Sequence, residues 1–277
     1  MKADNPKIKA DSPKNVVQSV AKAFAVLRAF DNGVPELTLS EVASRAHLDR
    51  GTTFRLLKTV VELGYVRPVP GSRRFRLGLK CLELGFSALA GRDLPEHAAP
   101  LLREVVPKIA DAGSLGVLEQ GEVFYVQRVQ VGLGRHGIDR RPGSRTGAYA
   151  SALGHAILAH LPKQAQVEHL ESLERVKVSE RTVVDLDALL DRLEQVRQQG
   201  YAVSDGENAY GLRTVAAPIF DVDGQPLAGL SLTISADRMS LKEFVEAALP
   251  EVKRMTEELT ASVRLSLGSI GVADRLR

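Results

Sequence analysis

The spacing of hydrophobic residues predicts three helices in the N-terminal third of the chain. The first, at about 16–30, has an apolar face formed by Val17, Val20, Phe24 and Leu27. The second opens on Thr38 and Glu41, which match the S/T-x-x-E pattern of a capping box, and ends near His47. The third follows a tight turn and covers about 50–63, with Phe54, Leu57, Val60 and Val61 facing inward. Two short helices joined by a tight turn are typical of a helix-turn-helix.

A β-hairpin is predicted directly after the third helix. Residues 65–67 and 73–77 have strand character, and residues 68–72 between them form a turn with Pro and Gly. The returning strand contains three arginines, Arg73, Arg74 and Arg76. A basic hairpin in this position is a wing, which reaches phosphates or a neighbouring groove of DNA.

The predicted DNA-binding residues lie on the third helix and the wing. Arg55 is the leading base reader, because a guanidinium can bond guanine O6 and N7 together. Thr52 and Thr53 at the helix start are expected to bond phosphate or a base edge. The remaining predicted contacts are Arg50, Lys58, Arg73, Arg74 and Arg76. The alternative for any one arginine is an ordinary solvated surface residue.

The rest of the chain alternates predicted hairpins with amphipathic helices. The expected strands are 116–118, 123–131, 201–204, 215–220 and 227–234. The expected helices are 94–112, interrupted by Pro100 and Pro107; 151–161; 186–198; and a last one opened by the capping box Ser240 and Glu243 and kinked at Pro250. This order predicts an α+β domain, in which helices pack on an antiparallel sheet.

Composition and charge support two domains with different partners. The chain has 277 residues, and residues 1–85 contain 15 Lys and Arg against 8 Asp and Glu, a net charge of +7, whereas the remainder has −4. A lone Cys81 excludes a disulfide framework. No run of about 18 apolar residues and no N-terminal apolar segment is present, so we expect a cytoplasmic protein without a membrane partner.

The sequence contains no convincing catalytic, metal or cofactor site. Residues 132–137 match G-x-G-x-x-G, but the following residues break a helix and no acidic residue stands near Ile157, so a dinucleotide site is not expected. A Walker loop, H-E-x-x-H and G-x-S-x-G are absent, and the six histidines do not have metal-ligand spacing.

Several segments together resemble the IclR family of bacterial transcription regulators. Residues 51–57 (GTTFRLL), 64–66 and 74–78 resemble the winged helix-turn-helix of that family, and 79–90 resembles its interdomain helix. Residues 150–159, 196–202, 205–207, 211–213 and 216–219 are similar to its sensor domain. The sequence departs from the pattern at Gly51, Phe75 and His155.

The resemblance implies a domain order and a fold. The expected order is a disordered basic arm (1–15), a winged helix-turn-helix (16–78), a linker helix (79–92), a GAF-like effector-binding sensor domain (93–268) and a tail (269–277). In the linker helix, Leu82, Leu84, Phe86 and Leu89 suit packing and Cys81 is expected to be buried.

The resemblance also implies an effector pocket in the sensor domain. Its expected lining is Ala152, Leu153, Asp205, Leu212, Thr214, Ser231 and Thr233. Alternation along a strand places the hydroxyls of Ser231 and Thr233 on one face, and the helix start at Ser151 has free amides for a carboxylate. The open alternative is that Ser231 and Thr233 are cross-strand or solvent-facing residues. Arg141 or Arg145 is considered as the cation for an acid.

These features predict a sequence-specific transcription regulator that is not an enzyme and has no cofactor. It is expected to bind a palindromic operator as a homodimer or homotetramer and to respond to a small organic acid. Residues 143–145, 149–150 and 211–213 resemble the branch that regulates protocatechuate, 4-hydroxybenzoate and β-ketoadipate catabolism. The alternatives are a small-molecule-converting enzyme with an accessory DNA-binding domain, and a non-specific DNA-binding protein.

Overall fold

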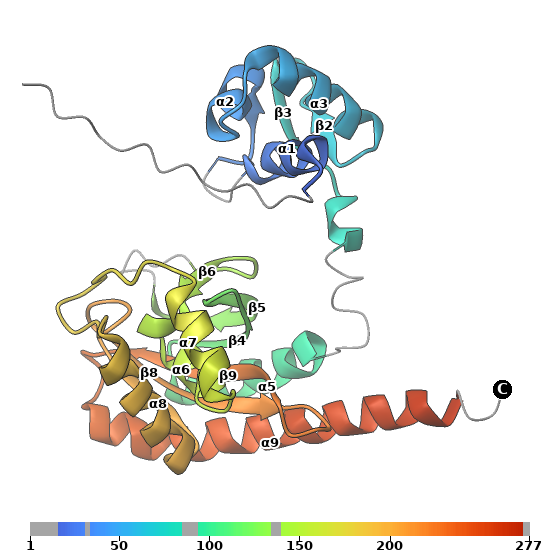
Figure 1. Ribbon diagram of the computed structural model, residues 1–277. Helices are drawn as coiled ribbons and strands as arrows, with labels where there is room; N and C mark the ends of the chain where they lie inside the picture. Colours follow the sequence, from blue (N-terminus) through green and yellow to red (C-terminus); the bar gives the residue numbers. More distant parts are fainter. Residues whose placement is uncertain (1–15, 31–33, 85–93, 134–139, 274–277) are drawn as a thin grey trace, which may run out of the picture. The chain divides into compact units, whose positions relative to one another are not determined.

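The chain forms two compact units, residues 1–90 and 91–277, in a computed structural model that describes residues 16–30, 34–84, 94–133 and 140–273 (Figure 1). The division lies within the predicted linker. The predicted arm, the 134–137 part of the glycine-rich loop, and Phe86 and Leu89 lie outside the described residues.

The first unit is a winged helix-turn-helix. Its helices are α1 (Gln18–Arg28), α2 (Leu39–Arg45) and α3 (Arg50–Glu62). Its antiparallel sheet has the order β1-β3-β2 and consists of β1 (Leu37–Thr38), β2 (Val66–Pro68) and β3 (Arg74–Leu77). The predicted capping box is confirmed, because the Thr38 amide donates to Glu41 Oε2 at 2.7 Å and the Glu41 amide donates to Thr38 Oγ1 at 3.4 Å. Strand β1 was not predicted from the sequence.

The predicted inward face of α1 is wrong except at Leu27, which is half-buried and packs against the core. Val17 is 63% exposed and Val20 and Phe24 are also exposed, whereas Val26 and Phe30 are buried. The helix has apolar residues on more than one side, and periodicity does not tell which side meets the other two helices. The buried side chains of α1 form one core with Val42, Leu57 and Val66.

The predicted inward face of α3 needs a similar correction. Leu57 and Val60 are buried as expected, but Phe54 is exposed and Thr53 is fully buried in its place. Thr53 is satisfied inside the core because its hydroxyl donates to the Asp49 carbonyl at 2.8 Å.

The second unit contains a six-stranded antiparallel sheet, which confirms the α+β class. The strand order is β6-β5-β4-β9-β8-β7. The strands are β4 (Ala112–Glu119), β5 (Glu122–Gln130), β6 (Arg145–Gly147), β7 (Ala202–Asp205), β8 (Leu212–Phe220) and β9 (Pro226–Ser235). The β4–β5 turn uses Gln120 and Gly121, both with positive φ (48° and 80°).

The predicted helices of this unit are present, with α5 and α6 shorter and α9 longer than predicted. The helices are α5 (Leu94–Ile109), α6 (Ala152–Leu158), α7 (Lys163–Glu171), α8 (Leu186–Gln199) and α9 (Leu241–Ala273), with a 3-10 turn at Ala148–Ala150. The predicted interruptions at Pro100 and Pro107 are wrong, because both lie inside α5, whose buried Leu102 and Val105 hold it on the sheet. Helix α9 likewise continues past Pro250 and into the predicted tail. Helix α7 was missed, since Leu170 is its one buried apolar residue.

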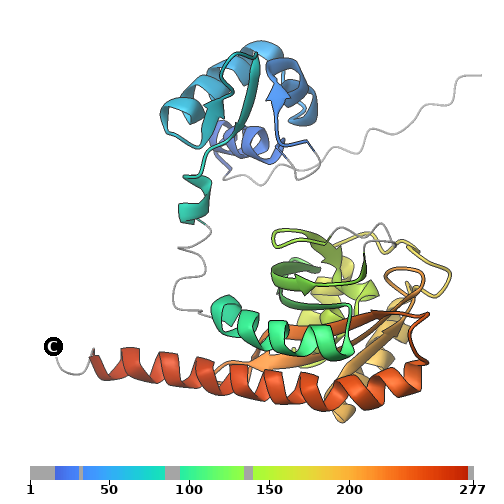
Figure 2. The same cartoon turned by 180° about the vertical axis from the view of Figure 1, so that it is seen from behind.

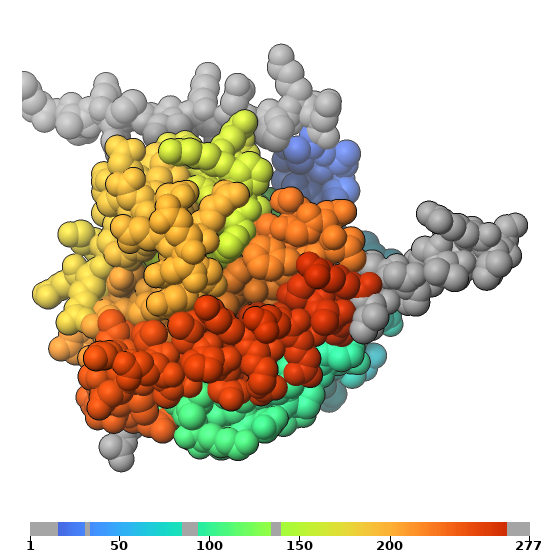
Figure 3. All heavy atoms as spheres, turned by 90° about the horizontal axis from the view of Figure 1, so that it is seen from below, coloured from blue at the N-terminus to red at the C-terminus, as the bar shows by residue number. Residues whose placement is uncertain are grey.

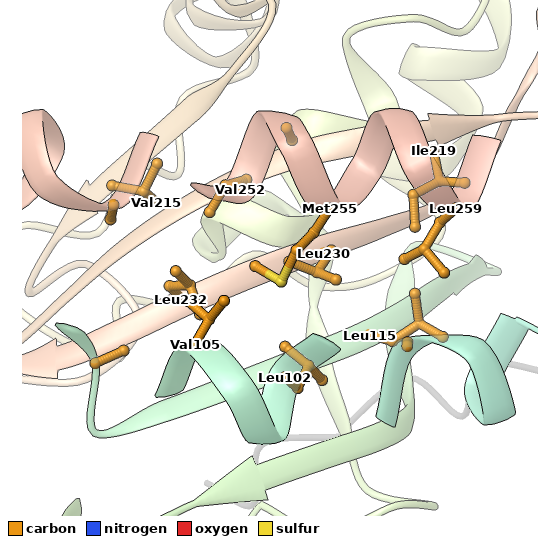
Figure 4. Packing of buried hydrophobic residues seen from close by; sticks show 14 of the residues in the cluster. Leu102, Val105, Leu115, Val215, Ile219, Leu230, Leu232, Val252, Met255 and Leu259 are labelled. Atoms are coloured by element: carbon orange, nitrogen blue, oxygen red, sulfur yellow. The ribbon is translucent and has the colours of Figure 1, made fainter. Parts of the chain in front are cut away.

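The two faces of the sheet carry different helices. Helices α5 and α9 lie side by side and cover one face (Figures 2 and 3). Leu102 from α5 and Met255 from α9 point toward Leu230 and Leu232 of β9 in the core between them (Figure 4). Helices α6 and α8 lie on the opposite side.

Two glycines allow α6 to lie close to the sheet. A Cβ at Gly116 would fall 2.5 Å from Leu153 Cδ2, and one at Gly229 would fall 3.1 Å from Ile157 Cγ1. A side chain at Gly116 would force Leu153 or the helix to shift, and one at Gly229 would require Ile157 to move by a few tenths of an ångström.

We predict that Gly116→Ala lowers the free energy of unfolding by about 1–3 kcal/mol, because the added methyl overlaps Leu153 and Val123. The measurement is chemical denaturation of the whole chain. Leu153→Ala removes one overlapping group, so the double variant should lose less stability than the sum of the two single variants. Additive losses would contradict the close approach described here.

Candidate DNA-binding surface and effector site

One side of α3 is an exposed cationic strip. Asp49 caps the helix, since its Oδ1 accepts from the Thr52 amide at 2.8 Å, and the helix begins at Arg50. Arg50, Arg55 and Lys58 are exposed on the outer side, as predicted. Thr53 does not belong to this surface, because it is buried and its hydroxyl is used within the helix.

The wing adds a second set of cations. Arg73 and Arg76 are exposed, and Arg67 of β2 lies directly opposite Arg76 in the β2–β3 pair. Directly opposed residues share one face, so Arg67 and Arg76 lie side by side. The sequence prediction missed Arg67, although the pairing of the two hairpin strands could have found it.

Arg74 has a different role from its neighbours on the wing. Its Nη1 donates to the Glu36 carbonyl at 2.8 Å and lies 3.5 Å from Glu41 Oε2. The guanidinium therefore fixes the wing to the start of α2. Its predicted contact with DNA stays a prediction, since 43% of the side chain is exposed beside these bonds.

In the second unit, a row of small polar residues crosses the sheet face that α6 covers. Ser231 lies opposite Ser114, and Thr233 lies opposite Thr214, whose Oγ1 is 3.0 Å from Thr233 Oγ1. Alternation places all four on one face. Ser114, Ser231 and Thr233 are buried, so they do not face solvent.

Arg128 of β5 lies at the end of this polar row. It stands opposite Ser114, and its Nη1 donates to Ser114 Oγ at 2.7 Å. Its Nε and Nη2 donate to Gln130 Oε1 at 3.1 and 2.9 Å. The sequence prediction missed Arg128, because its relation to Ser231 depends on a strand order that brings β5, β4 and β9 together.

Of the two predicted cations, Arg145 has another partner, whereas the direction of the Arg141 guanidinium stays a prediction. Arg145 lies in the edge strand β6 and forms an ion pair with Glu122 at 3.2 Å. The backbone amide and carbonyl of Arg141 both bond the Ser144 hydroxyl in a turn.

The other predicted pocket residues divide into two groups. Leu212 packs with Ala112 and Leu133 on the polar face, and Ala152 and Leu153 are buried on α6. Asp205 is one residue out of phase with Ser204 and Thr214, so it stands on the opposite face. It is held by Arg213 at 2.9 Å and by Arg181. Placing Asp205 with Ser231 and Thr233 is therefore wrong.

The start of α6 has a side-chain cap for one of its amides. Ser151 Oγ accepts from the Gly154 amide at 3.0 Å, and the helix has seven residues. The carboxylate site at this helix start stays a prediction.

His155 is a fully buried residue of α6. Its Nε2 lies 2.6 Å from the Tyr149 carbonyl oxygen. Burial lowers the pKa of His155 to about 4, opposed by the Tyr149 hydrogen bond and assisted by the Arg192 guanidinium. Arg192 is in turn paired with Glu207 at 2.7 Å, a carboxyl whose pKa is raised by burial.

The described residues contain neither a metal site nor a membrane-spanning helix. Within residues 16–30, 34–84, 94–133 and 140–273, no three His, Cys, Asp or Glu side chains are grouped to hold a metal ion. In the same ranges, no helix is long and apolar enough to cross a membrane.

Cys81 of the predicted linker helix is half-buried rather than buried. Its Sγ is 3.3 Å from the Tyr65 carbonyl oxygen, and burial raises the pKa of its thiol. Leu82 and Leu84 of the linker are exposed.

Comparison with known families gives two matches that cover most of the chain. Residues 19–70 match the IclR helix-turn-helix domain, and residues 86–261 match the C-terminal domain of bacterial IclR transcriptional regulators.

Characterised relatives match over nearly their whole length. The HTH-type transcriptional regulator KdgR of Escherichia coli is 31% identical over 252 residues, which are 90% of this chain and 95% of KdgR. The Pca regulon regulatory protein of Pseudomonas putida is 30% identical over 241 residues, 87% of this chain and 82% of that protein.

Solved structures have the same architecture. A transcriptional regulator from Rhodococcus sp. RHA1 has a TM-score of 0.76 at 34% identity, covering 92% of this chain and 100% of that one. An IclR homolog of Microbacterium hydrocarbonoxydans in complex with 4-hydroxybenzoate has a TM-score of 0.76 at 24% identity, covering 88% and 98%. At 24% identity, the similarity to the Microbacterium structure shows a shared fold and no more.

We predict that acid destabilises the chain through His155. Its pKa is about 4 in the fold and 6.5 when unfolded, so the unfolded state binds the proton more tightly. Stability should therefore be lost as the pH falls from 7 toward 4, by up to about 3 kcal/mol. Denaturation at a series of pH values measures this loss. His155→Gln does not titrate and should flatten the profile; an unchanged profile would assign the loss to other groups.

Proposed function

This chain belongs to the IclR family of bacterial transcriptional regulators, and we propose that it reads a palindromic operator as a homo-oligomer and responds to a small organic acid. Members of the family are DNA-binding regulators with a C-terminal effector-binding domain, and they are not enzymes. The alternative of an enzyme with an accessory DNA-binding domain is accordingly not supported. The observation that carries the effector proposal is the buried polar row beside Arg128.

The DNA-reading proposal rests on the cations of α3 and the wing. Arg55 and Lys58 lie on the exposed side of α3, the helix that enters the major groove in a helix-turn-helix. Arg73, Arg76 and Arg67 are available to phosphates on the wing. Two half-sites of a palindrome need two copies of this unit, so a dimer is the smallest assembly that we propose.

The effector proposal rests on the chemistry of the polar sheet face. Hydroxyls from Ser231, Thr233 and Thr214 supply donors and acceptors, and Arg128 supplies a cation at the end of the row. A guanidinium binds a carboxylate strongly, because it can form charge-assisted hydrogen bonds. The neighbouring Leu212 and Leu153 supply apolar contacts for the body of the ligand. The effector is accordingly a compact molecule with a carboxylate at one end.

An aromatic acid is the effector class that we favour. The solved homolog with the same fold contains 4-hydroxybenzoate, and one relative is named for the Pca regulon. A phenol and a carboxylate at opposite ends of a ring match hydroxyls and a guanidinium at opposite ends of the polar row. The effector changes DNA binding only if it has different affinities for two arrangements of the chain.

We predict that Arg55→Ala lowers discrimination against a wrong base pair by about 1–3 kcal/mol at one position of each half-site. The operator is first selected from random duplexes with the wild-type chain, and affinities are then measured for single base changes. The matched control is Arg73→Ala, which should weaken all duplexes equally and reduce the salt slope by about 1. Unchanged base preference in Arg55→Ala would contradict its role as base reader. A wild-type chain without base preference would favour the non-specific DNA-binding alternative.

We predict that one acid in a panel of protocatechuate, 4-hydroxybenzoate, β-ketoadipate, glyoxylate, pyruvate and phenylacetate raises the melting temperature of the chain. A ligand at 100 times its Kd stabilises by about 2.7 kcal/mol. Arg128→Gln should remove most of this stabilisation, because the carboxylate loses its cation.

The matched control for Arg128 is Arg145→Gln at the sheet edge, which should leave the stabilisation unchanged. Equal effects of the two substitutions would exclude Arg128 as the carboxylate partner. No rise with any acid in the wild type would contradict the proposed effector class.

A further inference from the structure

Phe54 is an aromatic side chain that the first unit leaves outside its core. It is 57% exposed on α3, although the helix has a buried side formed by Thr53, Leu57 and Val60. A single exposed apolar side chain is common on a protein surface, so it is the position of Phe54, on the helix that enters the major groove, that indicates a partner.

The exposed charged neighbours of Phe54 on α3 are cationic. Residues three and four positions away share one side of a helix, and for Phe54 these are Arg50, Gly51, Leu57 and Lys58, of which Leu57 is buried. Arg50, Lys58 and the adjacent Arg55 are exposed. The acidic residue within α3, Glu62, lies two turns further on, and the carboxylate of Asp49 caps the helix start. Apart from that cap, the exposed charges nearest the ring are therefore positive.

Gly51 has no side chain beside this ring, and the nearest side-chain atom to a Cβ at this position would be Asp49 Oδ1, at 3.4 Å. Side chains of a helix lean toward its N-terminus, so Phe54 covers the turn that contains Arg50 and Gly51. Gly51 is exposed and has no side chain to compete for that surface. The ring is thus directed to the first turn of α3, which is the part of a recognition helix that contacts base edges.

The positive surroundings identify the partner as DNA rather than an apolar protein surface. The exposed cations are complementary in charge to the phosphates on either side of a DNA groove; they are Arg50, Arg55 and Lys58. Within the major groove, the apolar group available to a ring is the 5-methyl of thymine.

We propose that Phe54 contacts a thymine methyl group in each half-site and thereby specifies an A·T pair at that position. This inference rests on the proposed function, in which α3 enters the major groove. It adds a hydrophobic contact to the hydrogen bonds expected of Arg55, so two chemically different contacts read neighbouring base pairs.

The test replaces individual thymines by deoxyuridine, which lacks the methyl group and keeps the base pair. The duplex is the site that the wild-type chain selects from random sequences, and Kd is measured at one salt concentration. At one thymine per half-site, wild-type affinity should fall about fourfold per methyl lost. Phe54→Ala should bind the thymine and uracil duplexes equally at that position.

Leu63→Ala is the matched control. Leu63 follows the last turn of α3 and is 52% exposed, close to the exposure of Phe54, but it lies far from the first turn. This variant should keep the wild-type uracil profile. Because Phe54 is exposed, Phe54→Ala should also keep the wild-type melting temperature.

Two results would overturn the inference while leaving the proposed function intact. One is a wild-type chain that selects a site yet shows no uracil penalty at any thymine. The other is a Phe54→Ala chain that retains the wild-type penalties. A wild-type chain that selects no sequence would instead overturn the proposed DNA reading, and this inference with it.

Discussion

The sensor unit depends on the alternation of side chains across its six-stranded sheet. Along each strand, every second residue must be apolar to face one side of the sheet, and the residues between must be small or polar to face the other. Leu230 and Leu232 meet α5 and α9, whereas Ser231 between them faces α6. A shift of one residue in the pairing would exchange these two sets, burying hydroxyls in the apolar layer and leucines where the ligand is proposed to bind. The fold and the proposed site are therefore fixed by the same register.

The DNA-binding unit is organised by a smaller set of polar contacts. Glu41 bonds the Thr38 amide at 2.7 Å and lies near Arg74, and Arg74 also bonds the Glu36 carbonyl. These contacts join the start of α2 to the strand of the wing. Side chains that lie far apart in the sequence thus set the position of the hairpin relative to the helices. The wing is therefore already ordered in the folded unit, so less conformational entropy is lost when DNA binds.

Local sequence signals predicted much of this architecture. Both capping boxes were predicted, and Ser240 and Glu243 form the second, with the Ser240 amide 2.8 Å from Glu243 Oε2. Gly200 has the positive φ (79°) expected at the end of a helix.

The sequence did not predict equally well which side chains face the core, because this depends on tertiary packing. The sequence did not reveal that Thr53 rather than Phe54 is buried, because an internal hydrogen bond satisfies the threonine. Asp205 was grouped with Ser231 and Thr233 although it lies on the other face of the sheet, and Arg128 was missed, because both depend on which strands are neighbours.

The alternation of the sheet also separates stability from ligand choice during evolution. Substitutions at Ser114, Thr214, Ser231 and Thr233 alter the chemistry of one face without touching the leucines and valines of the other. If the effector binds at this face as we propose, a few such changes would alter its chemistry while the layer that α5 and α9 cover stays intact. The same face would then be the starting point for engineering a response to another ligand.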